Sequence, residues 1–270
     1  MAGRAENKVA IVTGAGSAAG LPSPGIGQAI ATTLVREGAS VLLVDKDRAR
    51  AENTLSTFDG LAGKAAVFEG DVTSQSDCAA MVAAATDQFG GLDILVNNAA
   101  IDRHDALTDE SLEGYDAILE INLKGSYLAT AAAVPALIER GGGSIVMIGS
   151  IAGVRDSGTG HPAYCASKAG QLGLMVNIAG EYGRKNIRAN AVLPGIIASP
   201  MLVQSSGGGI SSDLMKRLNL LGRMGSSWDV ANAVLFLCSD EGSYMTGHVM
   251  PVDGGATMGM AGTFTRADRE

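Results

Sequence analysis

KVAIVTGAGSAAGLPSPGIG, residues 8–27, is the stretch that decides the fold. It opens with a short β-branched apolar run over residues 8–13, which is typical of a buried strand. A loop rich in glycine, serine and proline follows, and from Gly25 to Glu37 the apolar residues recur every fourth position, which predicts a helix. Glycines in such a loop let backbone N–H groups approach a pyrophosphate, and the helix N-terminus adds a favourable dipole. The stretch therefore predicts a nucleotide-binding unit.

The rest of the chain alternates short apolar runs with helical patterns. The other expected strands lie at 40–45, 65–69, 94–97, 144–149, 187–192 and 248–252. The helical stretches lie near 47–58, 74–89, 109–138, 162–183 and 227–239, and Pro135 is expected to kink or end the third of these. Continuous apolar strands separated by helices predict a parallel sheet covered on both faces. We therefore expect a single α/β domain over residues 1–270, with a Rossmann-like doubly wound fold of about seven parallel strands.

The composition excludes several classes of protein. Apolar residues make up 46% of the chain and charged residues 18%, a balance that favours folding over disorder. The net charge is −8 and no basic run exists to neutralise phosphates along a strand, so nucleic-acid binding is not expected. No apolar stretch is long enough to span a bilayer, and the first residues lack the apolar region of a signal peptide. We therefore expect a cytoplasmic protein without a membrane partner.

The cysteines and histidines show no pattern for a disulfide framework or a metal site. Cys78, Cys165 and Cys238 are few and scattered, so three free thiols are expected, with Cys165 as a buried apolar residue. The three histidines of the chain are not paired at ligand spacing, and no metal site is predicted. His104 lies in a loop that would face the substrate mouth, and His161 could line the pocket, but a solvated loop residue is the favoured interpretation of each.

Asp45 ends the second expected strand, eighteen residues after Gly27. A carboxylate at this position of a dinucleotide-binding unit holds both ribose hydroxyls of an adenosine. The same carboxylate would repel a 2′-phosphate. The predicted cofactor is therefore NAD rather than NADP.

Tyr164 and Lys168 stand four residues apart in an expected helix, which puts the phenol and the ammonium on one face. A phenol titrates near ~10, and a neighbouring cation is expected to lower that pKa towards a useful value for a general acid/base. Ser150 follows the strand expected over 144–149, where the carboxyl end of a strand opens onto the ligand crevice. The three residues together predict a catalytic site.

From about Lys8 to Gly255 the chain resembles the short-chain dehydrogenase/reductase family, because its motifs occur in the order of that family. The matching pieces are Thr13-Gly14 with Gly25-Ile26-Gly27, Asp71-Val72, Asn97-Asn98-Ala99-Ala100, Asn122-Leu123-Lys124-Gly125, Ser150, Tyr164, Lys168, Pro194-Gly195 and Val252-Asp253-Gly254-Gly255. The chain departs from the family in three places. Residues 18–24 are inserted in the glycine motif, Ser199 stands where threonine is usual, and Ala100 stands where glycine is usual. The two prolines of the insertion exclude a continuous helix, so an ordered bulge is expected before Gly25.

The resemblance implies a role for each matching residue. Tyr164 would move the hydroxyl proton during hydride transfer, Ser150 would hold the substrate oxygen, and Lys168 would depress the tyrosine pKa and hold the nicotinamide ribose. Asn122 would support a water that relays protons to Lys168. The residues expected to bind the cofactor are Gly14, Ser17, Ile26, Asp45, Asp71, Val72, Asn98, Ala99, Tyr164, Lys168, Pro194, Ile197 and Ser199.

The expected substrate is a secondary alcohol or ketone. The candidate pocket residues are mostly apolar, namely Ile101, His104, Arg155, Met201 and Leu202. Residues of about 199–222 are expected to form the variable substrate loop, which would act as a lid. By resemblance, the protein is expected to form a homotetramer.

Three other functions remain open. A reductase of 3-oxoacyl groups on acyl-carrier protein belongs to the same family, although Asp45 disfavours the NADPH that many such enzymes use. A methyltransferase shares the glycine loop and the acidic second strand, but leaves Ser150, Tyr164 and Lys168 unexplained. A non-catalytic nucleotide-binding module would keep the fold alone. A serine hydrolase is excluded, because residues 148–152 lack both flanking glycines of a nucleophile elbow.

Overall fold

The computed structural model describes residues 3–18, 20–21, 23–155, 160–205 and 218–259. Within these ranges, seven parallel strands form one sheet in the order β3-β2-β1-β4-β5-β6-β9. The strands are β1 (Val9–Thr13), β2 (Ser40–Asp45), β3 (Lys64–Glu69), β4 (Ile94–Asn97), β5 (Gly143–Ile148), β6 (Ile187–Pro194) and β9 (Val249–Val252). The predicted doubly wound fold is therefore confirmed, and the strand bounds differ from the predicted ones by at most two residues.

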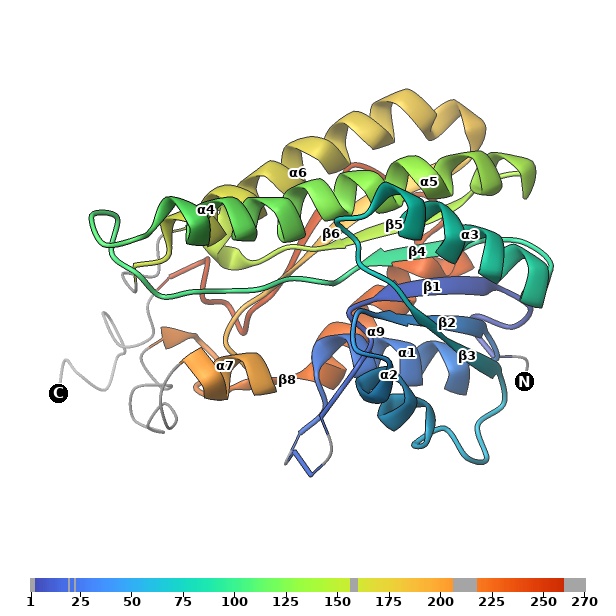
Figure 1. The fold of residues 1–270 in the computed structure, drawn as a ribbon, viewed down its shortest axis with the longest axis horizontal. Coiled ribbons are helices and arrows are strands. Elements are labelled where there is room, and N and C mark those ends of the chain that lie inside the picture. Colours follow the sequence, from blue (N-terminus) through green and yellow to red (C-terminus); the bar gives the residue numbers. More distant parts are fainter. Residues whose placement is uncertain (1–2, 19, 22, 156–159, 206–217, 260–270) are drawn as a thin grey trace, which may run out of the picture.

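Helices cover both faces of the sheet (Figure 1). One face carries α1 (Ile26–Arg36), α2 (Arg48–Leu55) and α9 (Ser227–Cys238), and the other carries α3 (Gln75–Phe89), α5 (Gly125–Glu139) and α6 (Pro162–Tyr182). Two shorter helices, α4 (Leu112–Leu119) and α7 (Pro200–Ser205), lie beyond the carboxyl ends of the strands. No helix in the described ranges has the length and apolarity needed to cross a membrane.

The apolar strands supply one core on each face of the sheet. Ile11 and Val12 are neighbours in β1 and both are fully buried, but they belong to different core clusters because successive side chains point to opposite faces. A strand buried on both sides must be apolar at every position, which explains the unbroken apolar runs in the sequence.

Two details of the fold go beyond the prediction. Of the two outcomes expected at Pro135, a kink or an end of the helix, the end does not occur, because α5 continues to Glu139. Pro135 itself is exposed, while Val134 and Leu137 beside it are buried against the sheet, so tertiary packing outweighs the hydrogen bond that proline removes. In addition, β7 (Ile197–Ala198) and β8 (Gly225–Ser226) pair in parallel outside the main sheet, and strands of two residues leave no periodic pattern.

Asn98 joins the carboxyl ends of β1 and β4. Its side-chain amide donates to the carbonyl oxygens of Thr13 and Gly14, each at 2.9 Å, and its backbone N–H donates to the Thr13 hydroxyl at 3.0 Å. Gly14 has a φ of +62°, a conformation that favours glycine. From β1 the chain adds strands toward one edge of the sheet, and from β4 it adds them toward the other edge. A crevice therefore forms at the carboxyl ends of β1 and β4.

Gly27 at the start of α1 packs directly on this junction. A Cβ atom at Gly27 would lie far inside van der Waals contact of the Gly14 carbonyl oxygen and of the Asn98 amide. We expect Gly27→Ala to lower the free energy of unfolding by about 2 kcal/mol or more, measured by urea denaturation. Gly25→Ala is the matched control, because a Cβ there meets no atom within 4 Å and its φ of −65° suits alanine. Equal stability of the two variants would contradict the prediction.

Candidate active site

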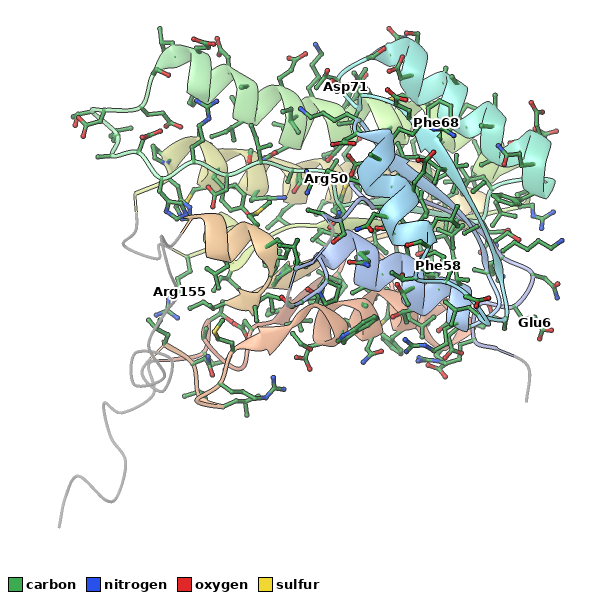
Figure 2. The ribbon with its side chains drawn as sticks, turned by 60° about the horizontal axis from the view of Figure 1, so that its bottom comes forward. Glu6, Arg50, Phe58, Phe68, Asp71 and Arg155 are labelled. Carbon is green, nitrogen blue, oxygen red and sulfur yellow. The ribbon has the colours of Figure 1, made fainter. Side chains whose placement is uncertain are left out.

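A cavity of about 1040 Å³ opens at the carboxyl ends of the central strands. It is lined by thirteen of the predicted cofactor-binding residues, namely Gly14, Ser17, Ile26, Asp45, Asp71, Val72, Asn98, Ala99, Tyr164, Lys168, Pro194, Ile197 and Ser199. Ser150 and the five predicted substrate-pocket residues line it as well. Figure 2 shows Arg50 and Asp71 near the middle of the molecule and Arg155 toward its left side, and all three border the cavity. The cavity is thus long enough to bring the glycine loop and the tyrosine into one compartment.

The glycine loop and the start of α1 form one part of the cavity wall. Gly14 and Gly27 keep the loop free of side chains, and the N-terminus of α1 begins at Gly25 without a side-chain cap. The first N–H groups of a helix lack partners within the helix, and they carry a partial positive charge. An uncapped helix start at a cavity wall is therefore suited to an anionic group.

The loop residues Gly16 and Ser17 lean towards α2. The Gly16 N–H donates to the Asp45 carboxylate at 2.9 Å, and the Ser17 N–H donates to the Arg50 carbonyl oxygen at 3.1 Å. Asn53 holds the Ser17 carbonyl oxygen at 2.8 Å. Both residues border the end of the cavity near Asp45, so the Ser17 backbone N–H is already used within the protein.

The inserted residues end in ordered contacts. The Ser23 hydroxyl donates to the Ala198 carbonyl oxygen at 3.0 Å, and the Ser227 hydroxyl donates to the Pro24 carbonyl oxygen at 2.8 Å. Residues 19 and 22 lie outside the described ranges. The insertion thereby ties the start of α1 to β7, the strand that holds Ile197 beside the buried Ser199.

Tyr164, Ser150 and Lys168 meet at the cavity wall. Tyr164 is the third residue of α6, and Ser150 follows β5. The side chains of Tyr164 and Ser150 form a hydrogen bond. The Lys168 ammonium is buried, lies 5.5 Å from the centroid of the Tyr164 ring, and donates to the Ile148 carbonyl oxygen at 2.8 Å. The phenol and the serine hydroxyl can therefore hold one oxygen between them.

The pKa of the tyrosine differs from the sequence expectation. Burial, followed by the Asp102 carboxylate, raises the pKa of the Tyr164 phenol above its ordinary value, and the Ser150 hydrogen bond only partly opposes this. Burial also lowers the pKa of Lys168 to about 8, with Asp102 acting in the opposite direction. The expectation of a lowered tyrosine pKa is therefore wrong for the chain alone, because burial and Asp102 outweigh the hydrogen bond from Ser150.

Asn122 lies behind the cavity wall rather than in it. It is fully buried in a π-helical segment, Glu120–Lys124, between α4 and α5. Its side chain accepts from the Ile101 N–H and donates to the Ile101 carbonyl oxygen, both at 2.9 Å, and also donates to the Ser167 hydroxyl at 3.1 Å. Asn122 thus positions the loop after β4 against α6, while its role in a water relay stays a prediction.

Comparison with known proteins identifies the family of this chain. Residues 21–257 match the family model described as enoyl-(acyl carrier protein) reductase. A crystal structure of a putative short-chain dehydrogenase/reductase from Burkholderia xenovorans superimposes with a TM-score of 0.89 at 35% identity, covering 96% of this chain and 99% of that chain. The chain belongs to the short-chain dehydrogenase/reductase family. The methyltransferase alternative is therefore wrong.

Two proteins similar to this chain carry the names of different activities. The chain is 36% identical over 261 residues to 2-(S)-hydroxypropyl-CoM dehydrogenase 3 of Xanthobacter autotrophicus, covering 95% of this chain and 99% of the relative. It is 37% identical over 252 residues to the 3-oxoacyl-[acyl-carrier-protein] reductase of Thermotoga maritima, covering 93% and 98%.

One cluster in the dehydrogenase/reductase was missed by sequence reasoning. Asp102, His104 and His161 converge beside Tyr164, although 57 residues separate the two histidines in the sequence. His161 is buried, against the expectation of a solvated residue, because it is the N-cap of α6 and stacks on Tyr164. Cys165 is half-buried instead of fully buried. Only the fold brings the three cluster residues together, so no sequence spacing indicated them.

Proposed function

We propose that this enzyme uses NAD to interconvert a secondary alcohol and a ketone. As a member of its family it is an oxidoreductase that acts on CH–OH groups. The observation that supports the reaction is the meeting of Tyr164, Ser150 and Lys168 at the wall of a cavity that the glycine loop and the start of α1 also line. When bound, a nicotinamide cofactor supplies the hydride donor or acceptor, and its oxidised ring adds a positive charge to the cavity.

The residues of the chain supply the proton chemistry. Tyr164 gives its phenolic proton to the oxygen of a ketone, or takes the proton from an alcohol, as the carbon gains or loses hydride. Ser150 holds the same oxygen and stabilises the charge that develops there. Lys168 keeps a positive charge near the phenol, which favours the phenolate during alcohol oxidation. A positive charge gained on cofactor binding acts in the same direction and opposes the effect of burial.

Asp45 carries the proposed preference for NAD. Its carboxylate ends β2 at the far end of the cavity, where it also accepts from the N–H groups of Gly16 and Asp47. Lys46 and Arg50 border the same end, and these cations would favour a 2′-phosphate. We give the Asp45 carboxylate more weight than the two cations, because it stands at the strand end where a ribose is held in this type of fold.

We expect NADH to bind about tenfold more tightly than NADPH, or better, in a fluorescence titration of the purified protein. Asp45→Asn retains an oxygen for the Gly16 N–H but removes the charge, and is expected to reduce this preference to about threefold or less. Arg50→Gln is the matched control, since it should weaken NADPH and leave NADH nearly unchanged. Tighter binding of NADPH by the unaltered enzyme would contradict the proposal.

A 3-oxoacyl reductase is the second candidate, favoured by the relative from Thermotoga maritima and by Lys46 and Arg50 at the cofactor end. Reduction of acetoacetyl-CoA with NADPH would support it over oxidation of secondary alcohols with NAD. No observation favours the non-catalytic module, because the chain belongs to a family of oxidoreductases.

The assembly and the lid are further parts of the proposal. We propose a cytoplasmic homotetramer, supported by the family resemblance and by exposed Tyr127 beside Leu123 and Leu174 in a surface depression formed by α5, α6 and the π-helical segment. Light scattering of the purified protein tests whether it is a tetramer.

We also propose residues of about 199–222 as the substrate loop, of which 206–217 lie outside the described ranges. Met201 in α7 borders the cavity and supports this assignment.

A further inference from the structure

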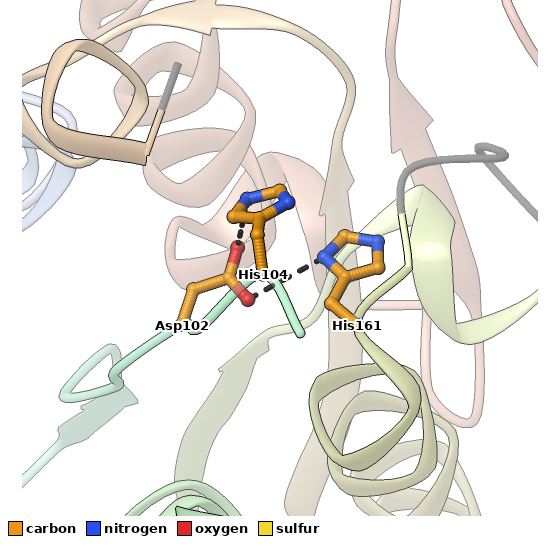
Figure 3. Close-up of side chains that lie close together, drawn as sticks. All are labelled: Asp102, His104 and His161. Carbon is orange, nitrogen blue, oxygen red and sulfur yellow. Dashed lines mark ion pairs between the residues drawn. The ribbon is translucent and has the colours of Figure 1, made fainter. Parts of the chain in front are cut away.

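Asp102, His104 and His161 form a polar cluster at the wall of the cavity (Figure 3). Asp102 and His104 belong to the loop between β4 and α4, and His161 precedes α6. The side chains of Asp102 and His161 are only 10% and 9% exposed, while that of His104 is 31% exposed. The cluster is thus a built feature of two packed segments rather than a meeting of mobile surface side chains.

Asp102 has one imidazole nitrogen beside each of its carboxylate oxygens. His104 Nε2 lies 3.3 Å from Asp102 Oδ2, and His161 Nδ1 lies 3.4 Å from Asp102 Oδ1. A hydrogen bond between an imidazolium and a carboxylate is usually shorter, about 2.7–2.9 Å. The two nitrogens lie beside different oxygens of the Asp102 carboxylate, and both separations are longer than a direct hydrogen bond. The carboxylate can therefore offer an oxygen to an ion placed between the two imidazoles.

The remaining geometry agrees with convergence on one point. One ligand atom from each residue lies within 4.8 Å of the other two. The two imidazole rings are stacked, with centroids 4.9 Å apart and planes inclined by 26°, and each ring faces its own oxygen of the Asp102 carboxylate (Figure 3). A single cation between them would neutralise the largely buried carboxylate and could accept a lone pair from each imidazole.

We propose that Asp102, His104 and His161 bind a divalent transition-metal ion such as Zn²⁺. Two imidazoles and a carboxylate are the ligand types that Zn²⁺ accepts, and three protein ligands leave one coordination position open. All three residues line the cavity that holds Tyr164, so the open position faces the compartment where a ligand is held. The class of group it takes is an oxygen donor, such as water, a hydroxyl or a carboxylate. The proposal does not rest on the oxidoreductase activity, since none of these residues moves the reacting proton.

The test is direct metal binding to the full-length protein after treatment with a chelator. Competition with a chromogenic chelator is expected to show one Zn²⁺ per chain, with a Kd in the micromolar range or below. Asp102→Asn and His104→Ala should each weaken binding at least about tenfold. His104→Ala is the variant best suited to the test, because its side chain is partly exposed and its loss should not prevent folding, which circular dichroism checks.

Two control variants separate this site from other ligands in the chain. His248→Ala removes an exposed histidine at the start of β9, and Cys165→Ser removes the half-buried thiol next to Tyr164; neither should change the Kd. With Co²⁺ in place of Zn²⁺, acetohydroxamate should alter the visible d–d spectrum through the open position. The proposal is overturned if Zn²⁺ does not bind stoichiometrically, or if Asp102→Asn and His104→Ala bind it as tightly as the unaltered protein. The first result would leave the cluster as a carboxylate shared by two histidines.

Discussion

Replacing Tyr164 with phenylalanine is expected to lower kcat for secondary-alcohol oxidation by about 10²–10⁴-fold, while the Kd for NADH changes by less than about twofold. The phenol is the group that hydrogen-bonds Ser150 inside the cavity, and phenylalanine keeps its ring, its stacking on His161 and its packing at the start of α6. The variant therefore removes one proton-transfer group and little else. Initial rates with the best alcohol from a panel, together with an NADH titration, measure both effects.

Tyr182→Phe is the matched control for this prediction. Tyr182 lies at the other end of the same helix and does not border the cavity, so its removal should leave kcat unchanged. If Tyr164→Phe retained more than about half of the rate, Tyr164 would not be the acid/base. If instead both the rate and NADH binding were lost, the residue would hold the cavity together rather than move a proton.

Much of the fold could be predicted because its causes are local or periodic. Strands such as β2 are apolar at nearly every position, since both faces of the sheet are covered, and this leaves a clear signal. Helix boundaries at Gly25 and Gly38 follow from glycine at the two ends of α1. By contrast, the passage of α5 through Pro135 depends on how Val134 and Leu137 pack against the sheet, which no local pattern records.

The candidate site was predictable where motif order carries the information, and not where distant segments meet. The residues of the cavity wall follow from the strand ends, because parallel strands bring their carboxyl ends to one edge. The effect of burial on Tyr164 could not be anticipated, since it depends on the closed surroundings of the ring and on Asp102. The contact of Asp102 with His161 is set by the packing of the β4–α4 loop on the start of α6, supported by the Asn122 bonds to Ile101.

Lys168→Met is expected to stabilise the protein and to inactivate it. At neutral pH the Lys168 ammonium is buried and donates a hydrogen bond to the Ile148 carbonyl oxygen, and burial lowers its pKa from 10.5 to about 8. Methionine keeps an unbranched apolar side chain and removes the buried charge. We expect the free energy of unfolding at pH 7 to rise by about 1–3 kcal/mol, and kcat to fall by about 10²-fold or more.

The pH dependence gives this prediction its sign. Because the folded pKa lies below the unfolded one, the unfolded chain binds the Lys168 proton more tightly between pH 8 and 10.5, so the unaltered protein gains stability as the pH rises through that window. The loss of stability caused by burying the charged Lys168 side chain is complete below about pH 8. The Lys168→Met variant does not have this loss at any pH. The stability difference between the two proteins should therefore be largest at pH 7 and shrink by pH 9.5, as measured by urea denaturation at each pH.

Lys185→Met, at an exposed site, is the control and should change the free energy of unfolding by less than about 0.5 kcal/mol. A Lys168→Met variant that is less stable than the unaltered protein at pH 7 would mean that the ammonium is held by favourable partners, and that its place beside Tyr164 costs the fold nothing.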